Sequence, residues 1–181
     1  MREYDEDRIR YNIQFTLLTY LRSSLPIRAQ EVSMADLAVR AVATVTQNPN
    51  EFHCDVTVTN DPVGSGYGDD DTVNTTAMVL LPVEATIKST YVEYESGLNC
   101  GGQNSCSAAS GTSAYVTCAL GHLSKQGNPT RTCAAVATIH VVTTPPIWPA
   151  QYVQTRSCGT FVYSDIHDSH MSNNYSQSVA P

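Results

Sequence analysis

Six cysteines carry the clearest chemistry in this chain of 181 residues, and they are Cys54, Cys100, Cys106, Cys118, Cys133 and Cys158. Their number is even, and no CxxC pair or Cys/His zinc spacing occurs. We therefore expect disulfides formed in an oxidising environment, with buried free thiols as the alternative. A bridge is expected from Cys118 to Cys100 or Cys106, which lie close to it in sequence. A second bridge is expected among the other three cysteines.

Two polar stretches contain side chains that metal ions use as ligands. GYGDDDTVN contains Asp69, Asp70 and Asp71, whose carboxylates are weak candidates for calcium. They are consecutive and do not alternate with other residues, so a solvated turn is the preferred interpretation. DIHDSHM places His167 and His170 three residues apart. That spacing suits a metal on a helix, whereas this stretch lies in an expected loop. We predict no metal at either place.

The sequence contains none of the common enzyme motifs. GxSxG, HExxH and GxxxxGK are absent, and no glycine-rich loop opens a helix. Ser, His and Asp residues are numerous, but nothing in the sequence places them together. We therefore predict a non-enzymatic protein with no catalytic residues and no cofactor.

The elements that position these residues are expected to be strands. Only 15% of residues are charged, against roughly 25% in ordinary soluble chains, and Thr, Ser, Val and Tyr are frequent. Beyond Pro26, short alternating stretches are separated by turns rich in Gly, Pro, Asn, Asp and Ser. They predict an antiparallel sandwich of seven or eight strands. The candidate strands are 36–44, 51–59, 75–81, 86–95, 114–120, 132–142, 152–163 and 175–179.

Alternation also assigns the inward face of three of these strands. The expected inward residues are Phe52, Cys54, Val56 and Val58 in the first, Val116, Cys118 and Leu120 in the second, and Cys133, Ala135, Ala137, Ile139 and Val141 in the third. We therefore expect Cys54, Cys118 and Cys133 to face the core.

The order of motifs resembles a known domain family over about residues 35–180. The motifs follow one another as DLAVRAVAT, DVTVTND, TTAMVLLPVEATIKST, YVTCALGHL, RTCAAVATIHVV and FVYSDIHDSHMSNNYSQSVA. This order is similar to the immunoglobulin-like domain of unknown function that recurs in bacterial cell-surface and adhesin-like proteins. The resemblance implies an immunoglobulin-like sandwich used for structure, spacing or adhesion, without catalytic residues. The chain departs from it by its single copy, the insertion at 64–71 and its additional cysteines.

The first 33 residues differ chemically from the body, residues 34–181, so we expect an N-terminal extension and one sandwich domain. The extension holds five of the ten cations and five of the seventeen acids, which leaves the body five cations, twelve acids and the whole net charge of −7. An acidic body without a basic stripe argues against nucleic-acid binding. No apolar run approaches the roughly 18 residues of a membrane span, and the acidic start MREYDED is unlike a secretory signal.

The stretch RIRYNIQFTLLTYL, residues 8–21, contains the candidate partner-binding residues. They are Ile9, Tyr11, Ile13, Phe15, Leu17, Leu18 and Leu21. Alternation from Ile9 to Leu17 fits a strand, whereas an i, i+4 stripe over the same stretch fits a helix, and both alternatives stay open. Exposed apolar faces require a cover. We therefore predict that the extension is a docking arm for neighbouring subunits of a homo- or hetero-oligomer.

These observations lead to two hypotheses about function. The body has the features of an extracellular, disulfide-containing domain, but the chain starts at Met1 without an export signal. The first expectation is a component of a virion, such as a head decoration, spike or fibre protein docked through the extension. The alternative is a secreted bacterial cell-surface adhesin or filament subunit that uses the extension as a donor strand. A hydrolase would need a convergent site that the sequence does not show.

Overall fold

The described part of the chain is almost entirely β-structure. This computed structural model describes residues 34–46, 48, 51–60, 71–82, 85–95, 97–108, 115–127, 130–144, 157–168 and 171–180. The chain divides between Val32 and Ser33 into two units, and all described residues lie in the second. The expected arm residues, from Ile9 to Leu21, lie outside the described residues.

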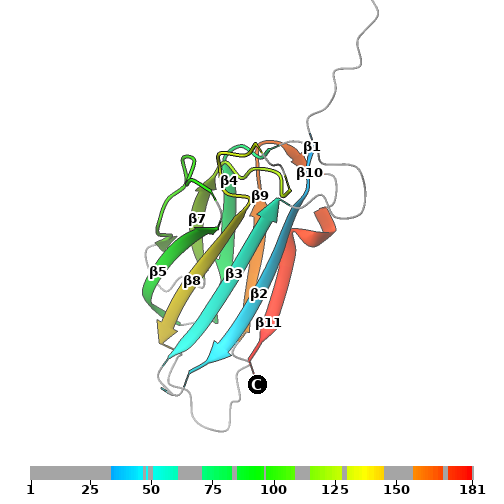
Figure 1. Ribbon diagram of the computed structural model, residues 1–181. Coiled ribbons are helices and arrows are strands. Elements are labelled where there is room, and N and C mark those ends of the chain that lie inside the picture. Colours follow the sequence, from blue (N-terminus) through cyan, green and yellow to red (C-terminus); the bar gives the residue numbers. More distant parts are fainter. Residues whose placement is uncertain are drawn as a thin grey trace, which may run out of the picture. The chain divides into compact units, whose positions relative to one another are not determined.

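Two antiparallel sheets face each other as a sandwich (Figure 1). The four-stranded sheet has the order β2 (Leu37–Val45), β3 (Phe52–Asn60), β8 (Val136–Thr144) and β5 (Thr86–Glu95). The five-stranded sheet has the order β11 (Tyr175–Val179), β9 (Ser157–Tyr163), β4 (Thr75–Leu80), β7 (Tyr115–Gly121) and β6 (Ser107–Ala108). A short parallel pair joins β1 (Met34–Ala35) to β10 (His167–Asp168), and the 3-10 helix η1 (Met171–Asn173) precedes β11. The prediction of an all-β sandwich is confirmed.

The core lies between the two sheets and follows the predicted alternation. Phe52, Cys54, Val56 and Val58 of β3 are all fully buried, as are Val116, Cys118 and Leu120 of β7. Burying a side chain such as valine or phenylalanine contributes about 1.5–3 kcal/mol relative to leaving it exposed. The alternation therefore supplies one apolar layer from each sheet.

The expectation for Cys133 is wrong, because β8 begins later than the predicted strand 132–142. Leu98 forms an isolated bridge with Cys133 and exchanges backbone hydrogen bonds with Thr132 and Ala134, each of 3.0 Å. A Cβ on Gly97 would lie 2.5 Å from the Ala134 nitrogen, so glycine permits this close approach. The backbone ahead of β8 thus holds a loop, and Cys133 is only partly buried.

Side chains close the sandwich where β2 lies beside β11. The N–H groups of Ala41 and Ala43 in β2 donate to Ser176 Oγ and Ser178 Oγ of β11, each at 3.0 Å. These serines are the inward-pointing residues of β11, between the exposed Tyr175, Gln177 and Val179. Hydroxyls therefore satisfy donors of an edge strand that would otherwise be open to pairing.

Residues 97–108 cover the opposite side of the sandwich. Val92 N donates to Asn104 O (2.9 Å), and Cys106 N donates to Thr90 Oγ1 (3.0 Å), so the segment follows β5. Gln103 N donates to Ala119 O of β7 (2.7 Å), and β6 within the segment pairs with β7. One loop thus connects the edges of both sheets.

Candidate functional site

The six cysteines form three disulfides, and these are Cys54–Cys158, Cys100–Cys133 and Cys106–Cys118. Cys118 pairs with Cys106, one of the two partners expected for it. The second bridge was expected between two of Cys54, Cys133 and Cys158, and Cys54 and Cys158 form it. The bridge from Cys100 to Cys133 was not anticipated, because it depends on the contact between the 97–108 segment and the chain ahead of β8.

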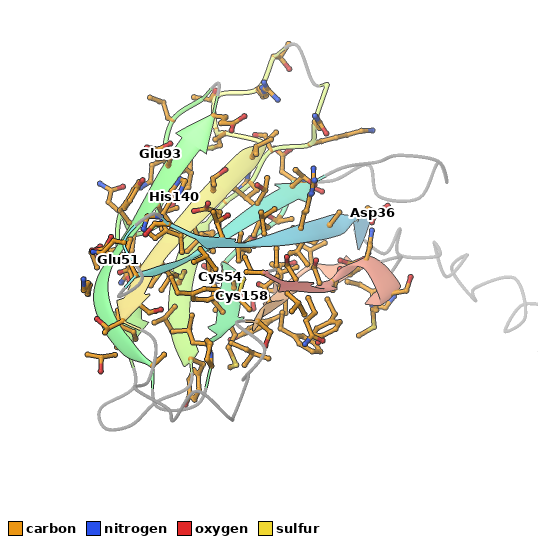
Figure 2. The ribbon with its side chains drawn as sticks, turned by 90° about the horizontal axis from the view of Figure 1, so that it is seen from below. Asp36, Glu51, Cys54, Glu93, His140 and Cys158 are labelled. Carbon is orange, nitrogen blue, oxygen red and sulfur yellow. A yellow bond between two sulfur atoms is a disulfide. The ribbon has the colours of Figure 1, made fainter. Side chains whose placement is uncertain are left out.

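The three disulfides add covalent links between strands and loops of the sandwich. The Cys54–Cys158 bridge crosses the core from β3 to β9, and so from one sheet to the other (Figure 2). The other two bridges fix the 97–108 segment at both of its ends. The sequence separations are 104, 33 and 12 residues. In the chain-entropy account, loops of these sizes correspond to about 3–5 kcal/mol each.

A buried polar cluster lies at the end of the sandwich where the described chain begins. Asp36, which is 2% exposed, accepts a hydrogen bond from Asn173 Nδ2 at 2.8 Å. The Asp36 N–H lies 3.4 Å from Asn60 Oδ1, and Leu37 N donates to Asp168 Oδ2 at 3.0 Å. The closing polar stretch of the sequence therefore fixes the start of β2.

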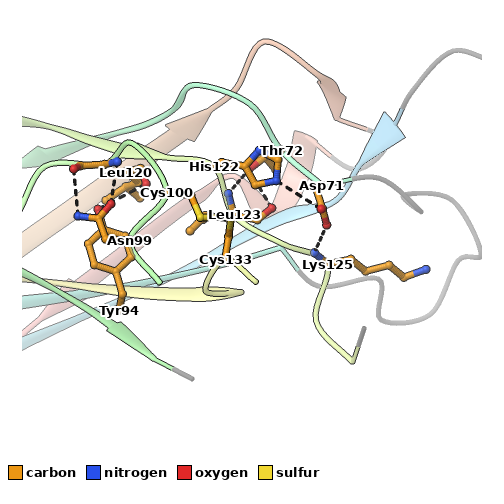
Figure 3. The surroundings of a disulfide bond; sticks show 11 residues. Asp71, Thr72, Tyr94, Asn99, Cys100, Leu120, His122, Leu123, Lys125 and Cys133 are labelled. Atoms are coloured by element: carbon orange, nitrogen blue, oxygen red, sulfur yellow. Dashed lines mark hydrogen bonds and ion pairs between the residues drawn. A yellow bond between two sulfur atoms is a disulfide. The ribbon is translucent and has the colours of Figure 1, made fainter. Parts of the chain in front are cut away.

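The two candidate metal sites do not assemble in the described residues. Asp71 Oδ1 accepts a hydrogen bond from Lys125 N at 2.7 Å, and Oδ2 lies 3.3 Å from His122 Nε2 (Figure 3). His167 belongs to the two-residue strand β10. Asp69, Asp70 and His170 lie outside the described residues. Within the described ranges, no group of three or more His, Cys, Asp or Glu side chains could hold a metal ion.

One histidine cluster was missed by sequence reasoning. His140 of β8 lies with Nδ1 2.7 Å from Asp55 Oδ1 and Nε2 3.7 Å from Glu93 Oε2. Its ring stacks on Tyr91, with centroids 4.4 Å apart. An Asp–His pair is part of a general-base arrangement, but among the described residues His140 Nε2 has no hydrogen-bond partner, so no nucleophile of that part of the chain completes the arrangement. The register of β3 against β8 brings these side chains together, and the alternation of each strand alone does not give that register.

The outer face of the five-stranded sheet carries no charged side chain among its described residues. The outward positions of β4, β7, β9 and β11 hold Thr, Ser, Ala, Gln and Gly besides seven large apolar or aromatic residues, which are Met78, Leu80, Tyr115, Phe161, Tyr163, Tyr175 and Val179. We call these outward positions the uncharged face. Residues that pair across neighbouring strands form rows on this face, and one row places Phe161 between Tyr175 and Met78.

Several side chains of the uncharged face are open to solvent. Phe161 is 52% exposed, Tyr163 53%, Tyr175 45% and Val179 54%. The Phe161 and Tyr175 rings pack together, with centroids 5.5 Å apart and planes inclined by 54°. Contiguous exposed apolar surface of this kind marks interaction sites on soluble proteins. The signal in the sequence is the placement of aromatic residues at the outward positions of β9 and β11.

The outer face of the four-stranded sheet is chemically different. It presents Arg40 of β2, Asp55 of β3, His140 of β8, and Glu93 and Glu95 of β5. Beside them, the ion pair between Lys88 Nζ and Glu51 Oε1 has a length of 2.8 Å. The sandwich therefore presents one charged sheet and one uncharged sheet to its surroundings.

No family model and no curated protein matches the chain. The family suggested by the order of motifs therefore remains an expectation. In the described ranges, no helix has the length and apolar character needed to cross a membrane.

Solved structures resemble the chain at low identity. The Fcho1 Mu homology domain of Danio rerio with bound Eps15 peptide is 14% identical, with a TM-score of 0.43 over 94% of this chain and 63% of that chain. The RrgA Jo.In complex is 12% identical, with a TM-score of 0.41 over 77% of this chain and 73% of that chain. A structure concerning Streptococcus parasanguinis adhesion by Fap1 fimbriae is 9% identical, with a TM-score of 0.31 over 81% of this chain and 88% of that chain. Values this low assign the chain to no family.

Proposed function

We propose that this protein is a non-enzymatic structural module of an extracellular assembly, either an adhesin-like protein or a filament subunit at a bacterial cell surface. The observation that carries the proposal is the pairing of all six cysteines in three disulfides. Disulfides persist in oxidising compartments and are rare in the cytosol. A sandwich fixed in this way suits a protein that works outside the cell.

The residue types on the uncharged face support binding to another protein as the activity. The uncharged face combines tyrosine, phenylalanine and methionine, which are enriched at the centres of protein interfaces, where charged residues are depleted. The sandwich presents this surface, and the extension before it, residues 1–33, docks the module on neighbouring subunits. No observation on the described residues favours a virion component, so the cell surface is the location that we propose.

The docking role is tested by changing the arm in the full-length protein. Replacing Ile13→Asp together with Leu17→Asp places two charges on the apolar positions shared by the helix and strand patterns. We expect the concentration-dependent mass of the disulfide-bonded protein, measured by sedimentation equilibrium, to fall to that of the monomer. Asn12→Asp with Thr16→Asp is the matched control, because it adds the same charge at polar positions and should leave the mass unchanged.

Two results contradict the proposal. Equal masses for the unchanged protein and the arm variant show that the arm does not dock subunits. Six free thiols and a purely intracellular location, measured by thiol labelling and by antibody access to intact cells of the natural source, exclude the extracellular role.

A further inference from the structure

The uncharged face has no cover among the described residues, and the chain ahead of them contains an apolar segment in need of one. We propose that residues 8–21 of one copy of this chain cover the uncharged face of a second copy. The inference rests on the proposed function, because it names the surface that receives the docking arm.

The edges at β2 and β7 are already occupied, which favours a face over these edges as the place for the arm. A strand added at an edge needs free backbone donors and acceptors. On β2, the Ala41 and Ala43 donors are satisfied by serine hydroxyls of β11. On β7, β6 and the Gln103 N–H occupy backbone positions, and the Cys106–Cys118 bridge holds that cover in place. An arm that packs on a face needs only side-chain contacts.

The chemistry of the two outer faces selects the five-stranded sheet. A partner that covers the four-stranded sheet must desolvate Asp55, His140 and Glu93, and buried charges are costly to desolvate. Covering the uncharged face removes only apolar and neutral polar groups from water. The row formed by Tyr175, Phe161 and Met78 crosses this face from the edge strand β11 to β4. Residues 8–21 contain eight apolar or aromatic side chains for such a surface, which are the seven candidates and Tyr20.

The lengths of the face and of the arm agree. Strands β4, β7, β9 and β11 have 6, 7, 7 and 5 residues, which corresponds to about 17–23 Å along each strand at about 3.3 Å per residue. A helix that carries the i, i+4 stripe from Ile9 to Leu21 is about 18–20 Å long. Its apolar stripe therefore spans the face from one end to the other.

The charges favour contact between arm and body over contact between two bodies. Residues 34–181 carry the whole net charge of −7, so two copies of the body repel each other. From residue 8 to residue 28 the chain has four arginines and no acid, so this stretch is cationic. The exposed Asp165 follows β9 at one end of the uncharged face. Residues 8–28 thus bring positive charge to an acidic body, whereas the extension as a whole, residues 1–33, is neutral.

The described chain begins beside that same end. Met34 pairs with His167, which follows Tyr163 of β9 by only a few residues. Residues 22–33 separate the arm from Met34, and they reach at most about 40 Å when fully extended. Two copies related by a two-fold axis can therefore exchange arms reciprocally, each covering the other's uncharged face.

Mixing two complementary variants of the full-length protein tests this exchange. The arm variant is Ile13→Asp with Leu17→Asp, and the face variant is Phe161→Glu with Tyr175→Glu. The changed face residues are exposed, so the sandwich should fold, and disulfide mapping and thermal melts check this. We expect each variant alone to self-associate about tenfold or more weakly than the unchanged protein. An equimolar mixture should form a heterodimer, because one intact arm meets one intact face.

The control for the face variant is Val42→Glu with Thr44→Glu on the outer face of the four-stranded sheet. Both residues are exposed in β2, and this variant should keep the mass of the unchanged protein. If the face variant also keeps it while the arm variant loses it, the face is not the receptor and the proposed function stands.

Two further results overturn the inference in other ways. If both variants lose self-association and their mixture does not restore it, the arm does not pass between copies. If the unchanged protein is a monomer at all concentrations and equals the arm variant in mass, the docking role of the extension fails together with the exchange.

Discussion

At the residue scale, one phenol connects the 97–108 segment to the sandwich. Tyr94 Oη lies 3.2 Å from Gln103 O of the segment and 3.4 Å from Leu120 O of β7, so its single O–H has an acceptor on either side. Figure 3 shows Tyr94 beside Leu120. Burial raises the pKa of Tyr94 above its ordinary value of 10.0, because the anion would lose its hydration. The folded protein therefore holds this proton more tightly than the unfolded chain does.

The sign of this shift predicts a loss of stability in alkali. The contribution of neutral Tyr94 is complete below pH 10 and is lost as the pH rises through the higher pKa of the folded state. Tyr94→Phe should cost about 1 kcal/mol at neutral pH and reduce the fall in unfolding free energy above pH 10, measured by urea denaturation. Tyr91→Phe, at an exposed tyrosine of the same strand, is the control. An unchanged alkaline slope in Tyr94→Phe would show that another group causes it.

The disulfides differ in the length of chain that each one closes. Replacing Cys54 and Cys158 with alanine opens a separation of 104 residues, whereas replacing Cys106 and Cys118 opens one of 12. The chain-entropy account predicts that the first double replacement costs about 2 kcal/mol more than the second. Urea denaturation of both variants measures the difference. Equal losses would mean that contacts of the buried sulfurs, and not loop length, determine the stabilisation.

At the scale of elements, β11 protects the edge of β2 through two serines. Replacing Ser176 and Ser178 with alanine leaves the Ala41 and Ala43 N–H groups without their acceptors. Each unsatisfied buried donor costs about 1–3 kcal/mol. We expect faster hydrogen exchange at these two amides, measured by NMR, and a lower free energy of unfolding. Ser157→Ala, on the outer side of β9, should change neither quantity. Unchanged exchange in the double variant would show that water replaces the hydroxyls.

The strands themselves could be predicted because each depends on its own residues. Alternation within Phe52–Asn60 and Tyr115–Gly121 assigns their buried faces correctly. The start of β8 could not be predicted, because Cys133 is held by Leu98 and Cys100 from a distant part of the chain. The same limit applies to His140 and Asp55, which meet only through the register of two strands.

At the scale of the whole molecule, the composition of the two outer faces depends on the order of the strands, which alternation within each strand does not determine. The sequence marks which residues point away from the core, but not which strands lie beside one another. Phe161 and Tyr175 lie 14 positions apart in the chain and become neighbours only because β9 pairs with β11. The uncharged face is therefore a property of the sheet order β11, β9, β4, β7, and no single strand reveals it.

The disulfide across the core also determines how the domain responds to pulling. In Figure 1, β1 and the end of β11 lie at opposite ends of the sandwich, so tension applied along the chain acts across its full length. The Cys54–Cys158 bond carries that tension past a separation of 104 residues, which would otherwise extend by about 350 Å. Only the segments before Cys54 and after Cys158 can lengthen, so the disulfide removes the longest part of the chain from the extension of the domain under load.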